Sequence, residues 1–156
     1  MHYTAPWWLP GGNLQTIWPA LYSRRFSGHP PAYRRERWSS PDNDFVDIDW
    51  MVPDASGSRL PAAPLSNTLL VMFHGLEGSS RSHYAEAFAD FASSHGMAFA
   101  VPHFRGCSGE LNGAPRAYHS GDHEEIDWLL RRFHQEWVMQ DPLNRVIIAA
   151  GVSLGG

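Results

Sequence analysis

The residues with the clearest chemical signature are residues 151–155 (Gly-Val-Ser-Leu-Gly), which fit the pattern G-x-S-x-G. A serine hydroxyl attacks a carbonyl only after a base removes its proton, and it must stand clear of its own backbone to reach a substrate. A sharp turn from a strand into a helix presents the hydroxyl in this way, and small flanking residues let the strained turn close. The motif therefore predicts Ser153 as a nucleophile for acyl transfer. The N–H of Leu154, at the start of the following helix, is the predicted donor to the developing oxyanion.

A second candidate donor follows another apolar run. Residues 68–73 form an unbroken apolar stretch, and His74, Gly75 and Leu76 come directly after it. In hydrolases with this serine motif, the second oxyanion donor lies in a loop that follows an earlier strand. Because glycine lets the backbone turn, the N–H of Leu76 is the predicted partner of the Leu154 N–H. His74 is expected to hydrogen-bond the loop backbone rather than to act as a catalytic base.

The loop at residues 102–110 carries further reactive side chains. Arg105 is expected to pair with Glu77 or with Glu110 and so to brace the site. Cys107 is an alternative nucleophile, but nothing in the sequence places a base beside it.

A third polar cluster contains His119 and His123, which are four residues apart as metal ligands can be. Gly121 interrupts that spacing, so a helix start with acidic residues in its first turn is the favoured interpretation. We expect no metal and no cofactor.

The elements that must position these residues follow from hydrophobic periodicity. Strands are expected at residues 45–52, 68–73, 98–101 and 145–150, and helices at 84–95 and 122–137. Residues 35–38 are expected to pair with the first of these strands across a turn. The order predicts an α/β fold, with a mostly parallel sheet, an antiparallel N-terminal hairpin and helices on both faces.

Composition narrows the class of protein. The chain of 156 residues is 43% hydrophobic and 18% charged, which suits one domain, or a piece of one, with a substantial core. The net charge of −4 gives no reason to expect a nucleic-acid partner. One cysteine, no signal peptide and no apolar run long enough to span a bilayer together predict a cytoplasmic protein.

Residues 1–40 differ in composition from the rest, being rich in Trp, Pro and Arg. The favoured interpretation is an irregular arm packed on a domain that comprises residues 41–156. The alternative is peripheral contact with a membrane surface or an acyl chain through Trp7 and Trp8.

Five blocks of residues together resemble one family, the YheT-like branch of the α/β-hydrolase superfamily. The blocks are residues 12–19, 74–79, 103–110, 118–121 and 151–156. The resemblance implies a serine hydrolase of the carboxylesterase type that acts through an acyl-enzyme on a small-molecule or lipid ester. It also implies that Ser153 is the nucleophile, that Leu76 and Leu154 supply the oxyanion hole, and that no cofactor is needed.

The chain departs from the family pattern at one point. In this fold the acid and the base of the triad follow the serine along the chain, and only Leu154, Gly155 and Gly156 follow Ser153. We therefore expect the N-terminal half of an α/β-hydrolase fold, a fragment that lacks the triad acid and base and is inactive alone. Its last strand should form an apolar edge. A lipase or thioesterase on the same fold, and a non-catalytic binding protein that keeps the fold, remain the alternatives.

Overall fold

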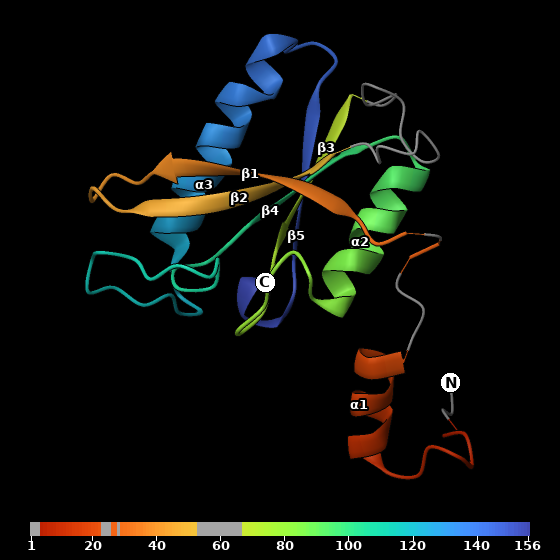
Figure 1. Cartoon of the computed structure of the whole chain (residues 1–156). Helices are drawn as coiled ribbons and strands as arrows, with labels where there is room; N and C mark the ends of the chain where they lie inside the picture. The colour runs from red at the N-terminus through yellow and green to blue at the C-terminus, as the bar shows by residue number, and fades with distance from the viewer. Residues whose placement is uncertain (1–3, 23–25, 28, 53–66) are drawn as a thin grey trace.

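The computed structural model describes residues 4–22, 26–27, 29–52 and 67–156. Its five strands form one sheet in the order β1-β2-β4-β3-β5 (Figure 1). The strands are β1 (Ala32–Ser39), β2 (Phe45–Val52), β3 (Thr68–Phe73), β4 (Ala98–Pro102) and β5 (Val146–Gly151). Strands were predicted at all of these places, with β1 longer than the expected segment at residues 35–38.

The sheet has an antiparallel part and a parallel part. β1 and β2 form a hairpin in which Ser39 faces Phe45. β2 also runs antiparallel to β4. β3 is parallel to both of its neighbours, β4 and β5. The carboxyl ends of the three parallel strands therefore lie at one edge of the sheet, which is where open α/β folds bind ligands.

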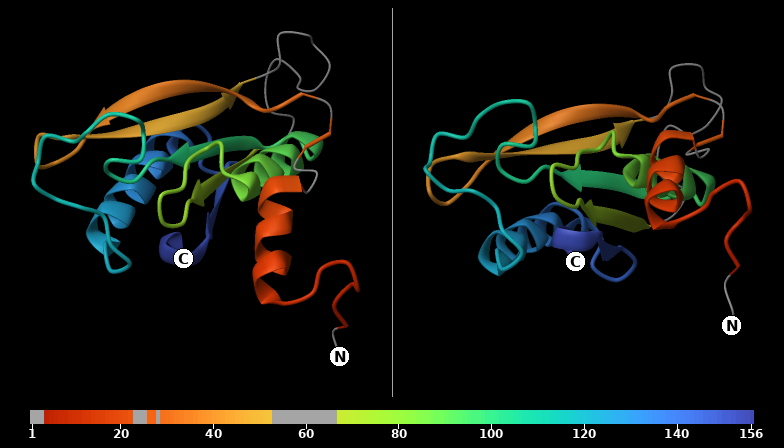
Figure 2. Two further views of the ribbon diagram at one scale, coloured as in Figure 1. Left: turned by 60° about the horizontal axis from the view of Figure 1, so that its bottom comes forward. Right: turned by 90° about the horizontal axis from the view of Figure 1, so that it is seen from below.

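Helices cover both faces of the sheet, as predicted (Figures 1 and 2). Because side chains alternate along a strand, β3 sends Leu70 and Met72 to one face and its odd-numbered residues to the other. The first face packs against the alanines of α2 (His83–Ser94), and the second packs against Leu129 and Phe133 of α3 (His123–Glu136).

The N-terminal segment contains a helix that the sequence analysis did not predict. α1 (Gly12–Tyr22) was expected to be irregular, and Pro19 in its interior explains why, since proline removes a helical hydrogen bond. α1 lies apart from the sheet, near the start of α2 (Figure 2). Some of the arm lies outside the described residues, and the domain boundary at residue 40 stays a prediction.

Two surface features bear on function. No helix in the described part of the chain is long and apolar enough to cross a membrane. β5 is an edge strand of the described sheet, and Val146 and Ile148 are 51% and 47% exposed, as the expected apolar edge requires.

Candidate active site

The register of the parallel strands brings the two predicted donor loops together. Phe73, the last residue of β3, pairs with Gly151, the last residue of β5. The N–H of Val152 donates to the Phe73 carbonyl oxygen at 3.1 Å, so both chains leave the sheet side by side. A Cβ atom placed on Gly75 would lie 3.3 Å from the Cβ atom of Ser153. The serine turn and the loop that carries Leu76 are therefore in direct contact.

Ser153 has a backbone that its side chain does not favour. Its φ of 55° lies in the left-handed region, and the residue is exposed at the start of a short 3-10 helix, Ser153–Gly155. Strain of this kind is typical of functional sites, and it is expected of a serine on a sharp strand-to-helix turn.

The glycines of the motif are required by contact distances. A Cβ atom on Gly155 would lie 2.5 Å from the Phe73 carbonyl oxygen and 2.6 Å from that of His74. A Cβ atom on Gly151 would overlap the backbone of Gly155. The turn can therefore close against β3 only with glycine at both positions.

The two predicted oxyanion donors share one property. Within the described residues, neither the N–H of Leu76 nor the N–H of Leu154 donates a hydrogen bond, although the N–H groups of Gly155 and Gly156 do. Unpaired backbone amides beside an exposed hydroxyl are the groups that can stabilise an oxyanion.

His74 fixes the direction of one of these amides. It is fully buried, its Nδ1 lies 2.8 Å from the Gly75 carbonyl oxygen, and its Nε2 accepts the N–H of Phe104 at 3.0 Å. The ring is therefore neutral with its proton on Nδ1, and burial lowers the pKa of His74 to about 4. Since C=O and N–H point in opposite directions across a trans peptide, a fixed Gly75 carbonyl also fixes the Leu76 N–H. These are the backbone contacts expected of His74.

Arg105 does not pair as the sequence analysis expected. Its buried guanidinium contacts neither Glu77 nor Glu110 but binds three acidic side chains, those of Asp42, Asp44 and Glu125. We call these four residues the Arg105 cluster. The partners come from the β1–β2 turn and from α3, so they are remote in sequence and give no local signal. The cluster ties the loop after β4 to both elements.

Two other candidate sites are Cys107, as a nucleophile, and His119 with His123, as metal ligands. Burial raises the pKa of the Cys107 thiol, which disfavours the reactive thiolate. His119 and His123 each bond through Nδ1 to the backbone of Gly121, at 3.1 Å and 3.0 Å. In the described ranges, no three His, Cys, Asp or Glu side chains lie together as metal ligands would.

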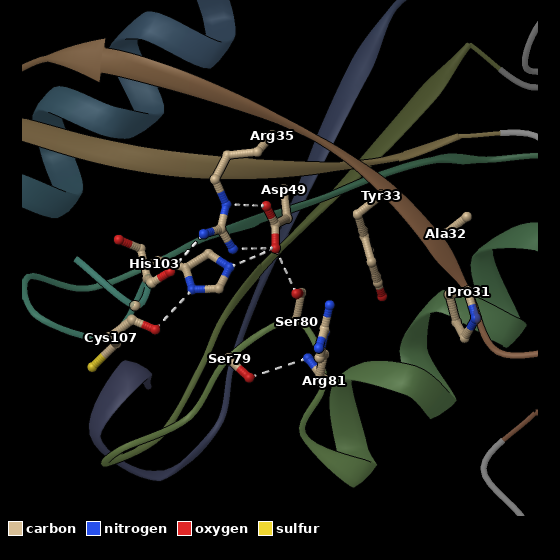
Figure 3. A pocket seen from close by; sticks show the side chains of 12 residues that line it. Pro31, Ala32, Tyr33, Arg35, Asp49, Ser79, Ser80, Arg81, His103 and Cys107 are labelled. Carbon is tan, nitrogen blue, oxygen red and sulfur yellow. Dashed lines mark hydrogen bonds and ion pairs between the residues drawn. The ribbon is translucent and has the colours of Figure 1, made fainter.

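A cavity of about 690 Å³ lies between β1, the segment just before α2 and the loop after β4 (Figure 3). At its wall Asp49 accepts hydrogen bonds from Arg35, His103 and Ser80. Burial alone would raise the pKa of Asp49, but these hydrogen bonds lower it well below its usual range. This group was not predicted from the sequence, although Arg35 lies opposite Asp49 in the hairpin register and the opposite charges were a signal.

Comparison with solved structures identifies the class of fold. An esterase of Pyrococcus furiosus superposes with a TM-score of 0.54 at 18% identity, over 85% of this chain and 48% of that one. Brefeldin A esterase, a bacterial homologue of human hormone-sensitive lipase, gives a TM-score of 0.50 at 12% identity, over 92% of this chain and 37% of that one. The chain has the N-terminal half of an α/β-hydrolase fold, as predicted.

Comparison with curated proteins gives a closer similarity. The chain is 41% identical to "Putative esterase YheT" of Escherichia coli (strain K12) over 92% of its length, which covers 38% of that protein. It is 26% identical to human phospholipase ABHD3 over 99% of its length, which covers 35% of that protein. The chain thus spans less than half the length of these relatives. The resemblance to the YheT-like branch is confirmed, while no family model matches the chain.

Proposed function

We propose that this chain supplies the nucleophile and the oxyanion hole of a serine esterase. In this proposal Ser153 attacks the ester carbonyl and forms an acyl-enzyme, while the N–H groups of Leu76 and Leu154 hold the oxyanion. One observation carries the proposal: an exposed serine with a φ of 55° lies two residues after the end of β5, in contact with the Gly75 loop. The names of the relatives support an ester substrate.

The triad acid and base are proposed to come from residues beyond these 156. Within the described residues the Ser153 hydroxyl makes no hydrogen bond, so no histidine of this part of the chain is placed to activate it. The 156-residue chain alone should therefore hydrolyse a p-nitrophenyl ester no faster than its Ser153→Ala variant. Turnover that depends on Ser153 in this chain would contradict this part of the proposal.

Labelling with a fluorophosphonate probe tests the nucleophile in the full-length gene product. We expect one labelled serine, and Ser153→Ala should abolish the labelling because the probe needs an activated hydroxyl. Ser94→Ala is the matched control, since Ser94 is an exposed serine at the end of α2 and should leave labelling intact. Labelling that survives in Ser153→Ala, or a wild-type protein that does not label, would contradict the proposal.

A lipid ester is the second candidate substrate. It is favoured by the similarity to a phospholipase and by the exposed aromatic residues of the N-terminal segment, of which Trp7 is 91% exposed. Flotation of the full-length protein with phosphatidylcholine vesicles tests it. Binding that is lost on Trp7→Ala and Trp8→Ala substitution would support a lipid substrate, and no binding would favour a small soluble ester.

A further inference from the structure

In the loop after β3, three of four successive backbone N–H groups donate hydrogen bonds. The N–H of Gly75 donates to the Tyr84 hydroxyl at 3.0 Å, and the N–H of Glu77 donates to the Tyr118 hydroxyl at 2.8 Å. The N–H of Gly78 donates to the Gly75 carbonyl oxygen at 3.0 Å. Among these four successive residues, and within the described chain, Leu76 alone has an N–H without a partner.

The turn that exposes this amide is strained. Residues 75–78 form a tight turn closed by the Gly78 hydrogen bond, and its third residue, Glu77, has a φ of 52°. Turns with a left-handed third residue favour glycine or asparagine there, so glutamate does not favour this geometry by itself. The competing turn type has a negative φ at that residue and rotates the peptide between Leu76 and Glu77. The Tyr118 hydroxyl bonds to the N–H of that same peptide and opposes the rotation.

Tyr118 is itself held in place. Its ring stacks on Phe104 with a centroid distance of 5.3 Å and an interplanar angle of 3°. The Phe104 N–H donates to His74, which in turn bonds the Gly75 carbonyl oxygen. Tyr118 is thus connected to the loop twice, directly through the Glu77 N–H and indirectly through Phe104 and His74. These contacts suggest a function for the block at residues 118–121, which contains neither the proposed nucleophile nor an oxyanion donor.

Tyr84 holds the other side of the loop from the first turn of α2. Its hydroxyl is so close to the turn that a Cβ atom on Gly78 would overlap it. The same hydroxyl lies 3.7 Å from the Cβ position of Gly75, which is the position in contact with Ser153. Tyr84 therefore sets the distance between α2 and the loop at the point where the loop meets the serine turn.

We propose that Tyr84 and Tyr118 are positioning residues for the oxyanion hole. Their hydroxyls accept the N–H groups of Gly75 and Glu77, which belong to the peptides on either side of the Gly75–Leu76 peptide. The two contacts hold the backbone on both sides of the Leu76 N–H, which would face the substrate oxyanion. This inference rests on the proposed esterase function, since it assigns no separate reaction.

Three Tyr→Phe substitutions in the full-length protein test the proposal. Tyr84→Phe and Tyr118→Phe keep the rings but remove the acceptors, and each should lower kcat and the fluorophosphonate labelling rate about 10- to 100-fold while KM changes little. Tyr33→Phe is the matched control, because the buried Tyr33 hydroxyl has no hydrogen-bond partner in the described structure. It should label at the wild-type rate.

The outcomes separate this inference from the proposed function. If wild-type protein does not label at Ser153, the proposed function fails. If it labels and both Tyr84→Phe and Tyr118→Phe label at the wild-type rate, the positioning role fails. A Glu77→Gly substitution makes the left-handed turn favourable, so it should restore much of the labelling rate of Tyr118→Phe. A double variant no faster than Tyr118→Phe would overturn the assignment of Tyr118.

Discussion

Two regions at the same edge of the sheet treat their polar groups in opposite ways. In the serine turn and the Gly75 loop, two residues other than glycine, Ser153 and Glu77, have a positive φ, and the N–H groups of Leu76 and Leu154 have no partner within the described chain. In the Arg105 cluster, the buried guanidinium donates four hydrogen bonds, all to carboxylates. The serine turn and the Gly75 loop leave N–H donors available to a ligand, whereas the Arg105 cluster uses its donors in hydrogen bonds within the protein.

The Arg105 cluster helps to explain how the strained backbone at Ser153 and Glu77 is stabilised. A strained backbone persists only where its surroundings determine it. The serine turn contacts the end of β3 and the Gly75 loop, and His74 at the start of that loop accepts the N–H of Phe104 from the loop after β4. Arg105 anchors that loop to α3 through Glu125 and to the hairpin turn through Asp42 and Asp44. A buried cluster of mutually hydrogen-bonded charges therefore supports a strained region with unpaired donors, and the two can be separated by mutation.

The largest effect on stability is expected from Arg105→Met. It leaves the buried carboxylates of Asp44 and Glu125 without their cation, which typically costs about 3–5 kcal/mol. Urea unfolding measures the change. Arg131→Ala is the matched control, because Arg131 pairs with Asp127 on the exposed face of α3 and its loss should leave the urea midpoint unchanged. Equal effects of the two substitutions would remove the distinction between the buried Arg105 cluster and the surface ion pair.

Acid should weaken the Gly75 loop before it weakens the Arg105 cluster. The folded protein holds the pKa of His74 at about 4, below its usual 6.5, so stability is fully present above pH 6.5 and is lost as the pH falls toward 4. The shift corresponds to about 3 kcal/mol. In the Arg105 cluster the pKa values of Asp42 and Asp44 lie below their usual 3.8, so their contributions are lost only in more acidic solution. Burial raises the pKa of Glu125 in the same cluster, so its protonation in acid favours the folded state.

Urea midpoints between pH 7 and pH 4.5 test this order. The decline should be reduced in His74→Gln and retained in His95→Gln, since His95 is an exposed histidine at the end of α2. An unchanged decline in His74→Gln would assign the acid sensitivity to another group.

The sequence predicted most of the fold because its strong signals are local. The apolar run at residues 68–73 and the helical period of α3 depend on neighbours in the chain, and the structure has these elements where they were expected. G-x-S-x-G is local as a sequence pattern, although only Gly151 is required by a contact within the turn and Gly155 is required by its contact with the end of β3. The partners of Arg105 and the two tyrosine hydroxyls depend on contacts across 9 to 63 residues, which no local pattern encodes. α1 was missed for the opposite reason, since a local signal, proline, outweighed a helix that forms in spite of it.

The smallest expected effect comes from two glycine substitutions, one in the serine turn and one beside the Arg105 cluster. Gly155→Ala places a Cβ atom 2.5 Å from the Phe73 carbonyl oxygen, so the serine turn must move away from β3. Overpacking of this kind typically costs about 1–3 kcal/mol, and labelling of Ser153 in the full-length protein should fall with it. Gly113→Ala adds the same methyl group beside Asp44, where the nearest atom is 4.0 Å away, and should change neither stability nor labelling. If Gly155→Ala were as silent as Gly113→Ala, the serine turn would have room to relax, and its left-handed φ would not be imposed by contact with β3.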